Sequence, residues 1–590
     1  MLGCALDLGA CDMDDFKIYG QAADAAFTLT LHRGEGMCLL AMNWRGGQRP
    51  PDDFVGFMIE FREPGIDRWW TLNNRLSFTD ASKITDKSKL STRLSPIQKF
   101  RWVHFPFAAA LPGAYSYRVT PVFMSPTDEL SYGTAQTADV VLKRETYPGE
   151  LNLGFTRGFV SSQAFVDNYG SSSGDVDALI PPGATKGDTG LLFHSTDPKA
   201  AVAYPWMGFA ARQQIIDLLD AAIADAGAQV RLVAYDFDLA EVYDRVVQLA
   251  GRIKVIIDNS GSHKAAGSAE NTAETLLQQK LGADNMLREH CGGLQHNKFI
   301  VVGGTVNRAV CGSTNFSWRG FYVQNNNAIT ISGADATGPF LKAFDAYWGA
   351  LNSSQKFAAA GLGGWIKLPL PSVDAELCFS PHAADTARLK ELADDIATAG
   401  SSLLYSLAFL YQTPGPIYDA IDGVTKTKDR FVYGISDRQI KKGNLGGLDV
   451  TMPDGNTAPV YPSALSKNVP PPFKQEPTGG SGIRMHHKFV VIDFDKPTAR
   501  VYVGSYNFSG AADTANGENL MVIRDRVATT AFMVEALSMF DHYHFRVAAS
   551  AATSNAPLVL AKPPVAGAKP WFDVDYNTAY KIRDREIFSA

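Results

Sequence analysis

Two periodicities of hydrophobic residues divide the chain. Between residues 26 and 145, short apolar runs rich in aromatic and β-branched residues alternate with Gly, Pro and Asp turns, as in "AFTLTLHR" and "FVGFMIEFRE". This spacing is typical of short antiparallel strands. We therefore predict a β-sandwich over residues 26–145, preceded by a weakly patterned lead at 1–25.

A second pattern begins near residue 205. In "GFAARQQIIDLLDAAIADAG" apolar residues share one helical face, and "QVRLVAYDF", "AEVYDRVVQLAG" and "RIKVIID" follow as a strand, a helix and a strand. The same order returns between "DTARLKELADDIATAG" and "RFVYGIS". Alternating strands and helices predict a mostly parallel, buried sheet in each of two similar halves.

These patterns set the expected domain boundaries: a linker at 146–204, a first α/β/α half at 205–355, a second half at 370–548 with an insert at 439–484, and a C-terminal extension at 549–590. The insert is Pro/Gly-rich and too long for a simple connection, which favours a lid or substrate loop over a plain surface loop. "GSSSG" at 170–174 matches a nucleophile elbow but lacks the flanking strand and helix, so we interpret it as a flexible loop. We expect the C-terminal extension to be an extended tail that packs back on the domain.

The N-terminal pattern resembles that of fibronectin type III or immunoglobulin-like domains. It contains two adjacent tryptophans, Trp69 and Trp70. We expect one of them to pack in the core and the other to lie half exposed. A surface binding patch is the alternative.

The strongest repeat carries polar residues. The first copy begins "QHNKFIVVGG" and continues to "GSTNFS"; the second begins "MHHKFVVIDF" and continues to "GSYNFS". In each copy a His and a Lys two positions apart share one face of an apolar strand. The matched pairs are His296 and His486, Lys298 and Lys488, Ser313 and Ser505, and Asn315 and Asn507.

These residue types suit a phosphodiester. Two lysines, two amides and two hydroxyls can stabilise negative charge on its oxygens. An imidazole, with an ordinary pKa of about 6.5, can serve as nucleophile or as general acid near neutrality. No Asp/Glu cluster accompanies the motifs along the sequence, so we expect neither a metal ion nor a cofactor. His290 and His487 lie outside the repeat register and are interpreted as structural.

The paired H-x-K and G-S-x-N motifs resemble those of the phospholipase D superfamily, over about residues 205–545. The second copy completes the family's H-x-K-x-x-x-x-D motif with Asp493, where the first copy has Gly303. The acidic residue that follows G-S-x-N in this family corresponds to Glu518 in the second copy and to Asn326 in the first.

This resemblance implies two α/β/α halves related by a pseudo-twofold axis, and cleavage through a covalent phosphohistidine without a metal. It also implies that the residue after each G-S-x-N supports the histidine of the other half, so that Glu518 orients His296 and Asn326 lies behind His486. A carboxylate strengthens a nucleophilic imidazole, whereas an amide only orients it. We therefore hypothesise that His296 is the nucleophile and His486 the general acid and base.

The composition of the chain narrows the class of substrate. The 590 residues carry a net charge of -6, with a pI near 6.0, which argues against non-specific duplex binding. We favour a phosphodiesterase that hydrolyses or transfers a phospholipid headgroup. An endonuclease acting on DNA or RNA is the first alternative, and a non-catalytic phosphate-binding module is the second. Trp318, Phe321 and Tyr322 could line an apolar mouth for acyl chains, stack bases, or belong to the core.

Other features of the sequence bear on where in the cell the protein is found. The six cysteines form no C-x-x-C pair, the N-terminus lacks a basic signal-peptide region, and no apolar run reaches eighteen residues. We expect a cytoplasmic protein without a membrane span. Peripheral membrane contact and secretion by another route stay open, and the sequence gives no indication of oligomeric state.

Overall fold

The computed structural model describes residues 16–158, 169, 178–181, 190–410, 414–427, 429–436, 448–451, 457–460, 485–551, 557–565 and 567–590. The "GSSSG" segment and most of the insert at 439–484 lie outside these residues. Contacts divide the chain into two units, one formed by Met1–Arg144 with Ser554–Ala590 and the other by Glu145–Thr553.

The first unit contains two antiparallel sheets that share one core. One sheet has the order β1(Lys17–Tyr19)-β2(Phe27–Arg33)-β3(Cys38–Trp44)-β6(Arg101–His104). The other has the order β5(Trp70–Thr71)-β4(Phe54–Arg62)-β7(Ala114–Met124)-β8(Leu130–Tyr132), with β9(Gln136–Val141) also paired to β7. Phe27, Phe57 and Tyr115 from both sheets pack together. The β-rich N-terminal region is therefore confirmed, while its fibronectin- or immunoglobulin-like topology stays a prediction.

The C-terminal extension returns to this unit. Helices α14(Asp573–Asn577) and α15(Ala579–Ser589) follow the long α13(Arg526–Ala551), and Phe572 is buried in the core of the first unit. The extension therefore packs back on a domain, as expected, but the expected extended conformation is wrong for Asp573–Asn577 and Ala579–Ser589, which are helical.

The two adjacent tryptophans differ from expectation. Trp69 is half-buried and Trp70 is 38% exposed, so neither packs in the core. The Arg118 guanidinium lies 4.3 Å from the Trp69 ring centroid, and the Arg68 guanidinium lies 3.8 Å from that of Trp70. The two indole rings are therefore covered by arginine side chains and not by the hydrophobic core.

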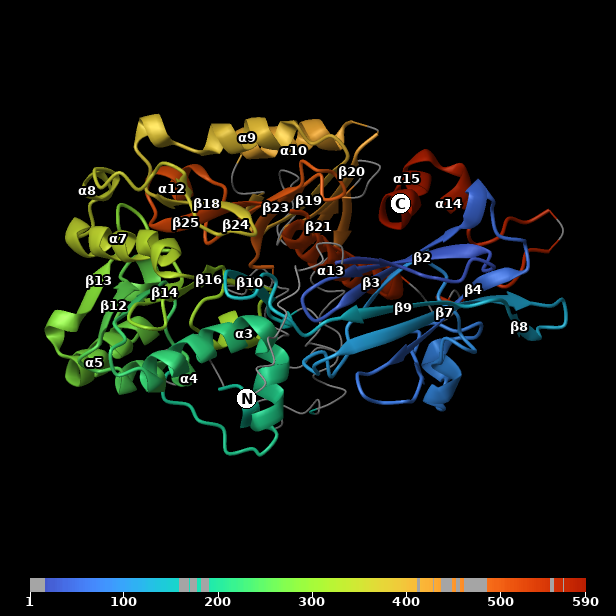
Figure 1. Ribbon diagram of the computed structural model, residues 1–590, viewed down its shortest axis with the longest axis horizontal. Helices are drawn as coiled ribbons and strands as arrows, with labels where there is room; N and C mark the ends of the chain where they lie inside the picture. Colours follow the sequence, from blue (N-terminus) through green and yellow to red (C-terminus); the bar gives the residue numbers. More distant parts are fainter. Residues whose placement is uncertain are drawn as a thin grey trace, which may run out of the picture. The chain divides into compact units, whose positions relative to one another are not determined.

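The second unit contains the duplicated halves. The sheet of the first half has the order β10(Leu151–Phe155)-β16(Asn327–Ser332)-β15(Arg308–Gly312)-β14(Phe299–Val302)-β11(Val230–Ala234)-β12(Ile253–Asp258)-β13(Met286–Glu289). Its helices are α3(Ala200–Ala224), α4(Ala240–Gln248), α5(Ala269–Leu281), α6(Trp318–Tyr322), α7(Ala334–Ala350) and α8(Ser354–Ala358). Figure 1 shows α3 and α4 on one side of this sheet and α7 on the other. The segment 146–204, expected as a linker, supplies β10 and the start of α3.

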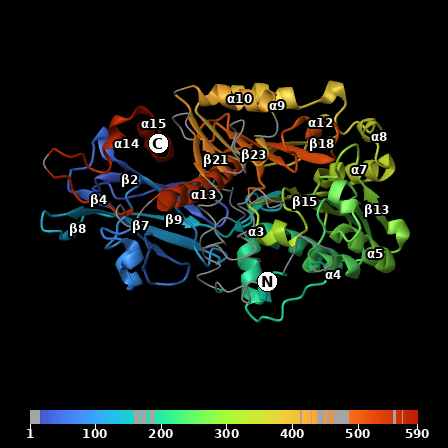
Figure 2. The ribbon, with the colours of Figure 1, turned by 180° about the vertical axis from the view of Figure 1, so that it is seen from behind.

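The second half repeats this plan. Its sheet has the order β17(Ile366–Lys367)-β18(Asp374–Ser380)-β25(Glu518–Arg524)-β24(Arg500–Gly504)-β23(Lys488–Ile492)-β19(Ser402–Leu407)-β20(Phe431–Ser436)-β21(Leu448–Thr451)-β22(Thr457–Val460). Helices α9(Leu389–Ala397) and α10(Pro416–Thr425) cover one face and α13 the other, as Figures 1 and 2 show from opposite sides. The short helix α12(Gly510–Thr514) follows the second G-S-x-N motif.

The expectation of mostly parallel sheets is wrong. In the described residues, only β11–β12, β12–β13 and β19–β20 pair in parallel. The strands that follow each H-x-K motif are joined by short turns, and a short turn can connect only antiparallel neighbours. Each sheet is therefore mixed.

Two matching aromatic clusters hold the halves together. Phe299, the residue after Lys298, packs at 5.6 Å from Phe340 of α7, which in turn lies 5.5 Å from Phe379 of β18 (ring centroids). Phe489 packs at 5.1 Å from Phe532 of α13, which lies 5.1 Å from Phe155 of β10. Since each helix follows the last motif strand of its own half and contacts a strand of the other, the contacts are reciprocal. No described helix is long and apolar enough to cross a membrane.

Candidate active site

Both H-x-K motifs lie at the junction of the two halves, at the start of central strands. Gln295 forms a bridge with Gly517, and Met485 forms the equivalent bridge with Asn325. These pairings place the residue before His296 and the residue before His486 each against the segment that follows the G-S-x-N motif of the opposite half. The two motifs, far apart in the sequence, therefore meet at one site.

The two imidazoles face each other. The ring centroids of His296 and His486 lie 6.4 Å apart, with the ring planes inclined by 67°. Both side chains are almost fully buried. This spacing suits a group held between two nitrogen atoms, one on each side.

A carboxylate from the second half contacts the first histidine. Nδ1 of His296 lies 2.7 Å from Oε2 of Glu518, which is itself fully buried. With Nδ1–H donating to this carboxylate, the lone pair of Nε2 is free to act as a nucleophile.

An amide from the first half contacts the second histidine. Nδ1 of His486 lies 2.8 Å from Oδ1 of Asn326, while Nδ2 of Asn326 donates to the carbonyl oxygen of Gly320 at 2.9 Å. The Gly320 carbonyl requires a donor, so the oxygen of Asn326 must face His486. Nδ1 of His486 therefore carries a proton, and Nε2 is directed elsewhere.

The two lysines are buried beside the histidines. Nζ of Lys298 donates to the carbonyl oxygen of His296, and Nζ of Lys488 donates to that of His486 at 2.8 Å. Lys298 Nζ also lies 4.8 Å from the ring centroid of Tyr235, and that ring packs 4.7 Å from His296. Tyr235 was not singled out from the sequence.

Burial controls the titration of these groups. It lowers the pKa of Lys298 to about 7 and that of His296 to about 4, although Glu518 opposes both shifts. Burial also lowers the pKa of Lys488 and of His486, and the positive charge of neighbouring lysines adds to it. Four groups that can carry positive charge thus share one buried site, and an oxyanion bound there would raise their pKa values.

The serines of the G-S-x-N motifs accept the same backbone hydrogen bond in both halves. Oγ of Ser313 accepts the backbone N–H of Asn327 at 3.0 Å, and Oγ of Ser505 accepts that of Asn519 at 3.0 Å. Each hydroxyl therefore fixes the loop to the strand fourteen residues later, and its proton stays available to a ligand.

The asparagines of these motifs differ. Nδ2 of Asn315 donates to Oδ2 of Asp236 at 2.6 Å, and Oδ1 of Asn315 is buried without a hydrogen-bond partner. Oδ1 of Asn507 is also buried without a partner. Asp236 was missed by the sequence reasoning. The one feature of the sequence that could have pointed to Asp236 is its position just after a predicted strand, in "AYDFD".

Asp493 lies away from the histidines. It follows β23, five residues beyond Lys488, or about 16 Å along the strand. Its carboxylate accepts the backbone N–H groups of Gly400 at 2.8 Å and Ser401 at 2.7 Å. Burial opposes the shift, but the backbone donors of this turn lower the pKa of Asp493.

The first half holds the same turn differently. Gly303 donates to the carbonyl of Gln229, as Asp493 does to that of Ser402. Here Asp225, at the end of α3, accepts the N–H of Thr305 at 3.1 Å. In the second half the carboxylate belongs to the residue that ends the strand, Asp493. In the first half it belongs to the segment on the other side of the turn, Asp225, so no aspartate is needed at 303.

The aromatic residues after the first G-S-x-N belong to the core. Trp318, Phe321 and Tyr322 are each at most 1% exposed and pack in the main cluster of the first half. They line no mouth for acyl chains and stack on no bases. His487 is also buried: Nδ1 lies 3.2 Å from Nδ2 of Asn327 and Nε2 lies 3.1 Å from Oε1 of Glu535.

The comparisons with known proteins agree with the motifs. The profile of a family described as "Cardiolipin synthase, PLD-like domain" matches residues 219–348 and again residues 392–542. No curated protein matches the sequence.

Three solved structures align with parts of the chain. Phosphatidylserine synthase of Haemophilus influenzae aligns with 16% identity over 56% of this chain and 83% of its own, with a TM-score of 0.37. Nuc of Salmonella typhimurium aligns with 23% identity over 23% and 86%, with a TM-score of 0.19. Yeast tyrosyl-DNA phosphodiesterase aligns with 9% identity over 52% and 86%, with a TM-score of 0.29. With both motif copies matched by the family profile, the chain belongs to the phospholipase D superfamily.

Proposed function

We propose that this protein is a phosphodiesterase of the phospholipase D type, acting through a covalent phosphohistidine on His296. The observation that carries the proposal is the pairing of two facing imidazoles, His296 and His486, with ring centroids 6.4 Å apart and two buried lysines beside them. One phosphoryl group held between the imidazoles would meet a nucleophile on one side and an acid on the other.

In the first step, Nε2 of His296 attacks phosphorus and forms the N–P bond, while the bond from phosphorus to the leaving oxygen breaks. His486 gives its proton to that oxygen, so the alcohol leaves neutral. In the second step, His486 takes a proton from water or another alcohol, whose oxygen displaces the histidine from phosphorus. Hydrolysis and transfer thus differ only in the acceptor.

The charges match these roles. The low pKa of His296, caused by burial, keeps this imidazole unprotonated and nucleophilic at neutral pH. The negative charge of a bound diester raises the pKa of His486, so the acid gains its proton when the substrate binds. Lys298, Lys488, Asn315 and Asn507 supply donors for the non-bridging oxygens. Ser313 and Ser505 hold the loops and offer hydroxyl protons.

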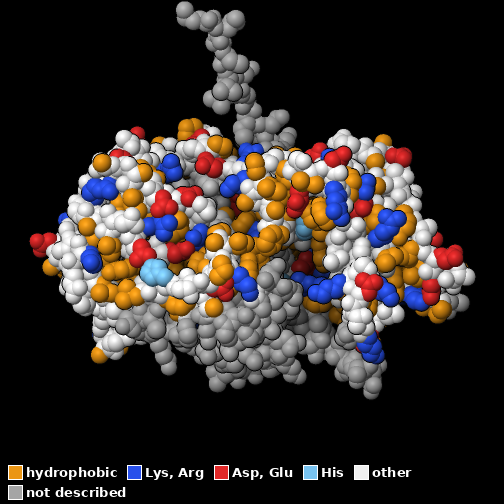
Figure 3. Space-filling view, turned by 90° about the horizontal axis from the view of Figure 1, so that it is seen from below, with side chains coloured by type: hydrophobic (Ala, Val, Ile, Leu, Met, Phe, Trp, Pro, Cys, Tyr) orange, Lys and Arg blue, Asp and Glu red, His pale blue; other side chains and the backbone are white. Residues whose placement is uncertain are grey.

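A phospholipid is the favoured substrate. The family profile carries the description of a cardiolipin synthase, and the net charge is -6. On the face drawn in Figure 3, Lys and Arg side chains of the described residues are interspersed with Asp and Glu rather than gathered in one basic stripe. Nucleic-acid backbones favour such a stripe. Because the aromatic residues near the first G-S-x-N are buried, they support neither substrate.

A substrate panel tests the proposal. Purified protein is assayed for headgroup release and alcohol exchange on phosphatidylcholine, phosphatidylethanolamine and phosphatidylglycerol vesicles, and for cleavage of single- and double-stranded DNA and RNA. Each assay is run with and without EDTA and with His296→Ala as the control. Lipid turnover that is lost in His296→Ala supports the proposal. Nucleic-acid cleavage alone would establish the nuclease, and inactivity on all diesters with saturable sulfate binding would establish the binding module.

A further inference from the structure

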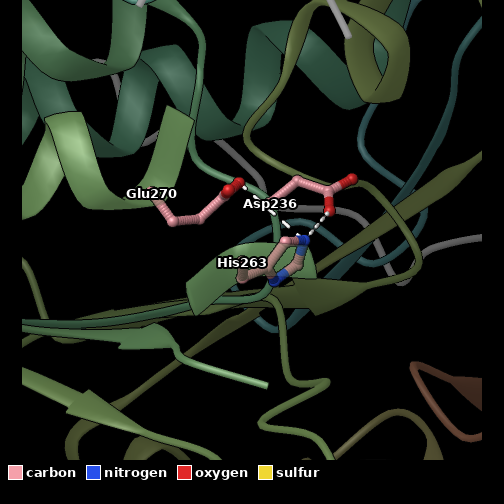
Figure 4. A group of neighbouring side chains, drawn as sticks. All are labelled: Asp236, His263 and Glu270. Carbon is pink, nitrogen blue, oxygen red and sulfur yellow. Dashed lines mark ion pairs between the residues drawn. The ribbon is translucent and has the colours of Figure 1, made fainter. Parts of the chain in front are cut away.

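Three side chains outside the motifs converge beside the candidate active site. Nε2 of His263 lies 3.2 Å from Oδ1 of Asp236 and 3.9 Å from Oε1 of Glu270, and the three ligand atoms lie within 4.8 Å of one another. Figure 4 shows the two carboxylates and the imidazole nitrogen pointing toward one common point. In tetrahedral sites with metal–ligand bonds of about 2.0–2.2 Å, ligand atoms lie roughly 3.3–3.6 Å apart. The two distances from Nε2 of His263 lie close to this range, and the two carboxylates need to approach each other by about 1 Å at most to match it.

The three residues come from separate elements at one edge of the sheet. Asp236 follows β11, His263 lies in the turn after β12, and Glu270 lies in the first turn of α5. The carboxyl ends of parallel strands are where α/β sheets bind ligands. Since β11 and β12 are one of the parallel pairs, the cluster occupies such a position.

A fourth residue fixes the imidazole from behind. Nδ1 of His263 lies 2.8 Å from Oδ2 of Asp258, a fully buried carboxylate. That carboxylate also accepts the N–H of Ser260 at 2.8 Å and the N–H of Gln295 at 2.7 Å. A histidine whose Nδ1–H is held by a carboxylate presents its Nε2 lone pair on the other side, as metal-bound histidines do.

This orientation creates an electrostatic demand. The Nε2 lone pair of His263 would face the carboxylate oxygens of Asp236 and Glu270, and both partners carry negative charge. A cation must lie between them, either a proton on Nε2 or a metal ion. Burial and the negative charge of Asp236 raise the pKa of the neighbouring Asp238 well above its usual range, so this carboxyl favours its neutral form and leaves Asp236 and Glu270 as the charged partners. A divalent ion would displace the proton from Nε2 and bring two positive charges between these carboxylates.

We propose that Asp236, His263 and Glu270 bind one divalent transition-metal ion, for which Zn²⁺ is the best match. One imidazole with two carboxylates suits Zn²⁺, whereas Mg²⁺ and Ca²⁺ prefer oxygen ligands alone. A water molecule would complete four-coordination.

The ion would support the phosphate site through Asp236. With Oδ1 of Asp236 on the metal, its Oδ2 keeps the hydrogen bond from Asn315, and the Tyr235 ring packs between His263 at 4.4 Å and His296 at 4.7 Å. The ion takes no part in the displacement and does not depend on the proposed activity.

Zinc binding to the full-length protein tests this inference without substrate. After EDTA treatment and dialysis, ZnCl₂ is titrated by calorimetry at pH 7, with MgCl₂ in parallel. One saturable Zn²⁺ per chain is expected, with no matching Mg²⁺ site, and His263→Asn and Glu270→Gln should each weaken the affinity by more than about 10-fold. His194→Asn is the matched control. Nε2 of His194 lies 2.7 Å from Asp244, with both side chains exposed, and this variant should bind Zn²⁺ as the wild type does.

Two results overturn the inference: no saturable Zn²⁺ binding to the wild type up to about 1 mM, or unchanged affinity in His263→Asn. Circular dichroism reports whether the variants fold. If neither cluster variant folds, zinc-edge X-ray absorption on the wild-type protein decides. One imidazole among oxygen ligands supports the site, whereas sulfur ligands or two or more imidazoles contradict it.

Discussion

Nδ1 of His296 lies 2.7 Å from Oε2 of Glu518, 222 positions away in the other half of the duplicated unit. The equivalent contact of His486 is made by an amide, Oδ1 of Asn326, at 2.8 Å. Each imidazole is therefore held at Nδ1 by a residue of the other half, but the partner of His296 is a carboxylate and the partner of His486 is a neutral amide. This difference is the physical basis for assigning the nucleophile to His296. It can be tested by two substitutions, one that removes the carboxylate beside His296 and one that adds a carboxylate beside His486.

Glu518→Gln should lower kcat/KM by roughly 10²–10⁴-fold. The amide preserves the shape of the side chain but no longer stabilises positive charge on His296 as the N–P bond forms. Activity on the substrate found in the panel measures the loss. Asn516→Ala, which removes a weak 3.4 Å donor to Glu518, is the control and should change activity far less. Equal losses in both variants would mean that Glu518 acts only through local packing.

Asn326→Asp should shift the alkaline limb of the pH–rate profile to higher pH. A carboxylate at this position would favour the protonated form of His486, whose pKa burial and the neighbouring lysines now lower. The general acid would then keep its proton at higher pH. The pH dependence of kcat/KM measures this shift, and an unmoved alkaline limb would show that His486 is not the acid.

The duplicated motifs were visible in the sequence because their spacing is local. His296 with Lys298, and Asn315 with Ser313, lie within one strand end or one loop, so the type and register of each pair could be predicted. The strands and helices near them also follow from hydrophobic periodicity. These features require no knowledge of the partner half.

Other features depend on contacts between distant segments. Asp236, His263 and Glu270 come from three elements, and no spacing in the sequence marks them as a cluster. The sequence could not show whether Trp318 is buried or part of an exposed aromatic patch, because the same local pattern of residues is compatible with both. The mixed sheet was missed because helix–strand alternation was weighed more heavily than the short turns after each H-x-K motif.

Asp493→Asn should reduce stability rather than catalysis. The carboxylate accepts the N–H groups of Gly400, Ser401 and Ser402, about 16 Å along the strand from Lys488, so its loss should cost about 1–3 kcal/mol of unfolding free energy. Its lowered pKa gives stability that is present above about pH 4 and is lost as the pH falls through the folded-state pKa. Urea unfolding at pH 7 measures the change.

Asp225→Asn is the matched variant in the first half. Its bonds to Thr305 are exposed, so the loss of stability should be smaller. A large fall in kcat/KM for Asp493→Asn, without loss of stability, would contradict a structural role.

Lys298→Met should stabilise the substrate-free protein by up to a few kcal/mol at pH 7, while abolishing activity. Burial lowers the pKa of Lys298 to about 7. Between about pH 7 and its ordinary pKa near 10.5, the unfolded chain holds the proton and the folded chain does not. Wild-type stability should therefore rise with pH across this window, and the variant should show less of this rise. Urea unfolding at pH 7 and pH 9 tests both statements; a variant less stable than the wild type at pH 7 contradicts them.

Binding of an oxyanion should be accompanied by proton uptake. Without a ligand, burial keeps His296 unprotonated at pH 7, with a pKa of about 4, and leaves Lys298 partly unprotonated, with a pKa of about 7. A sulfate ion placed among these groups raises the pKa of Lys298 and that of His486, which burial lowers without a ligand, so roughly one proton should enter with it at pH 7–8, and affinity should fall as the pH rises. Sulfate is the suitable probe because its own charge stays constant in this range. Calorimetry in buffers of different ionisation enthalpy measures the uptake, and Lys298→Met should reduce it. Zero uptake or net release would mean that the site is already fully protonated before the anion binds.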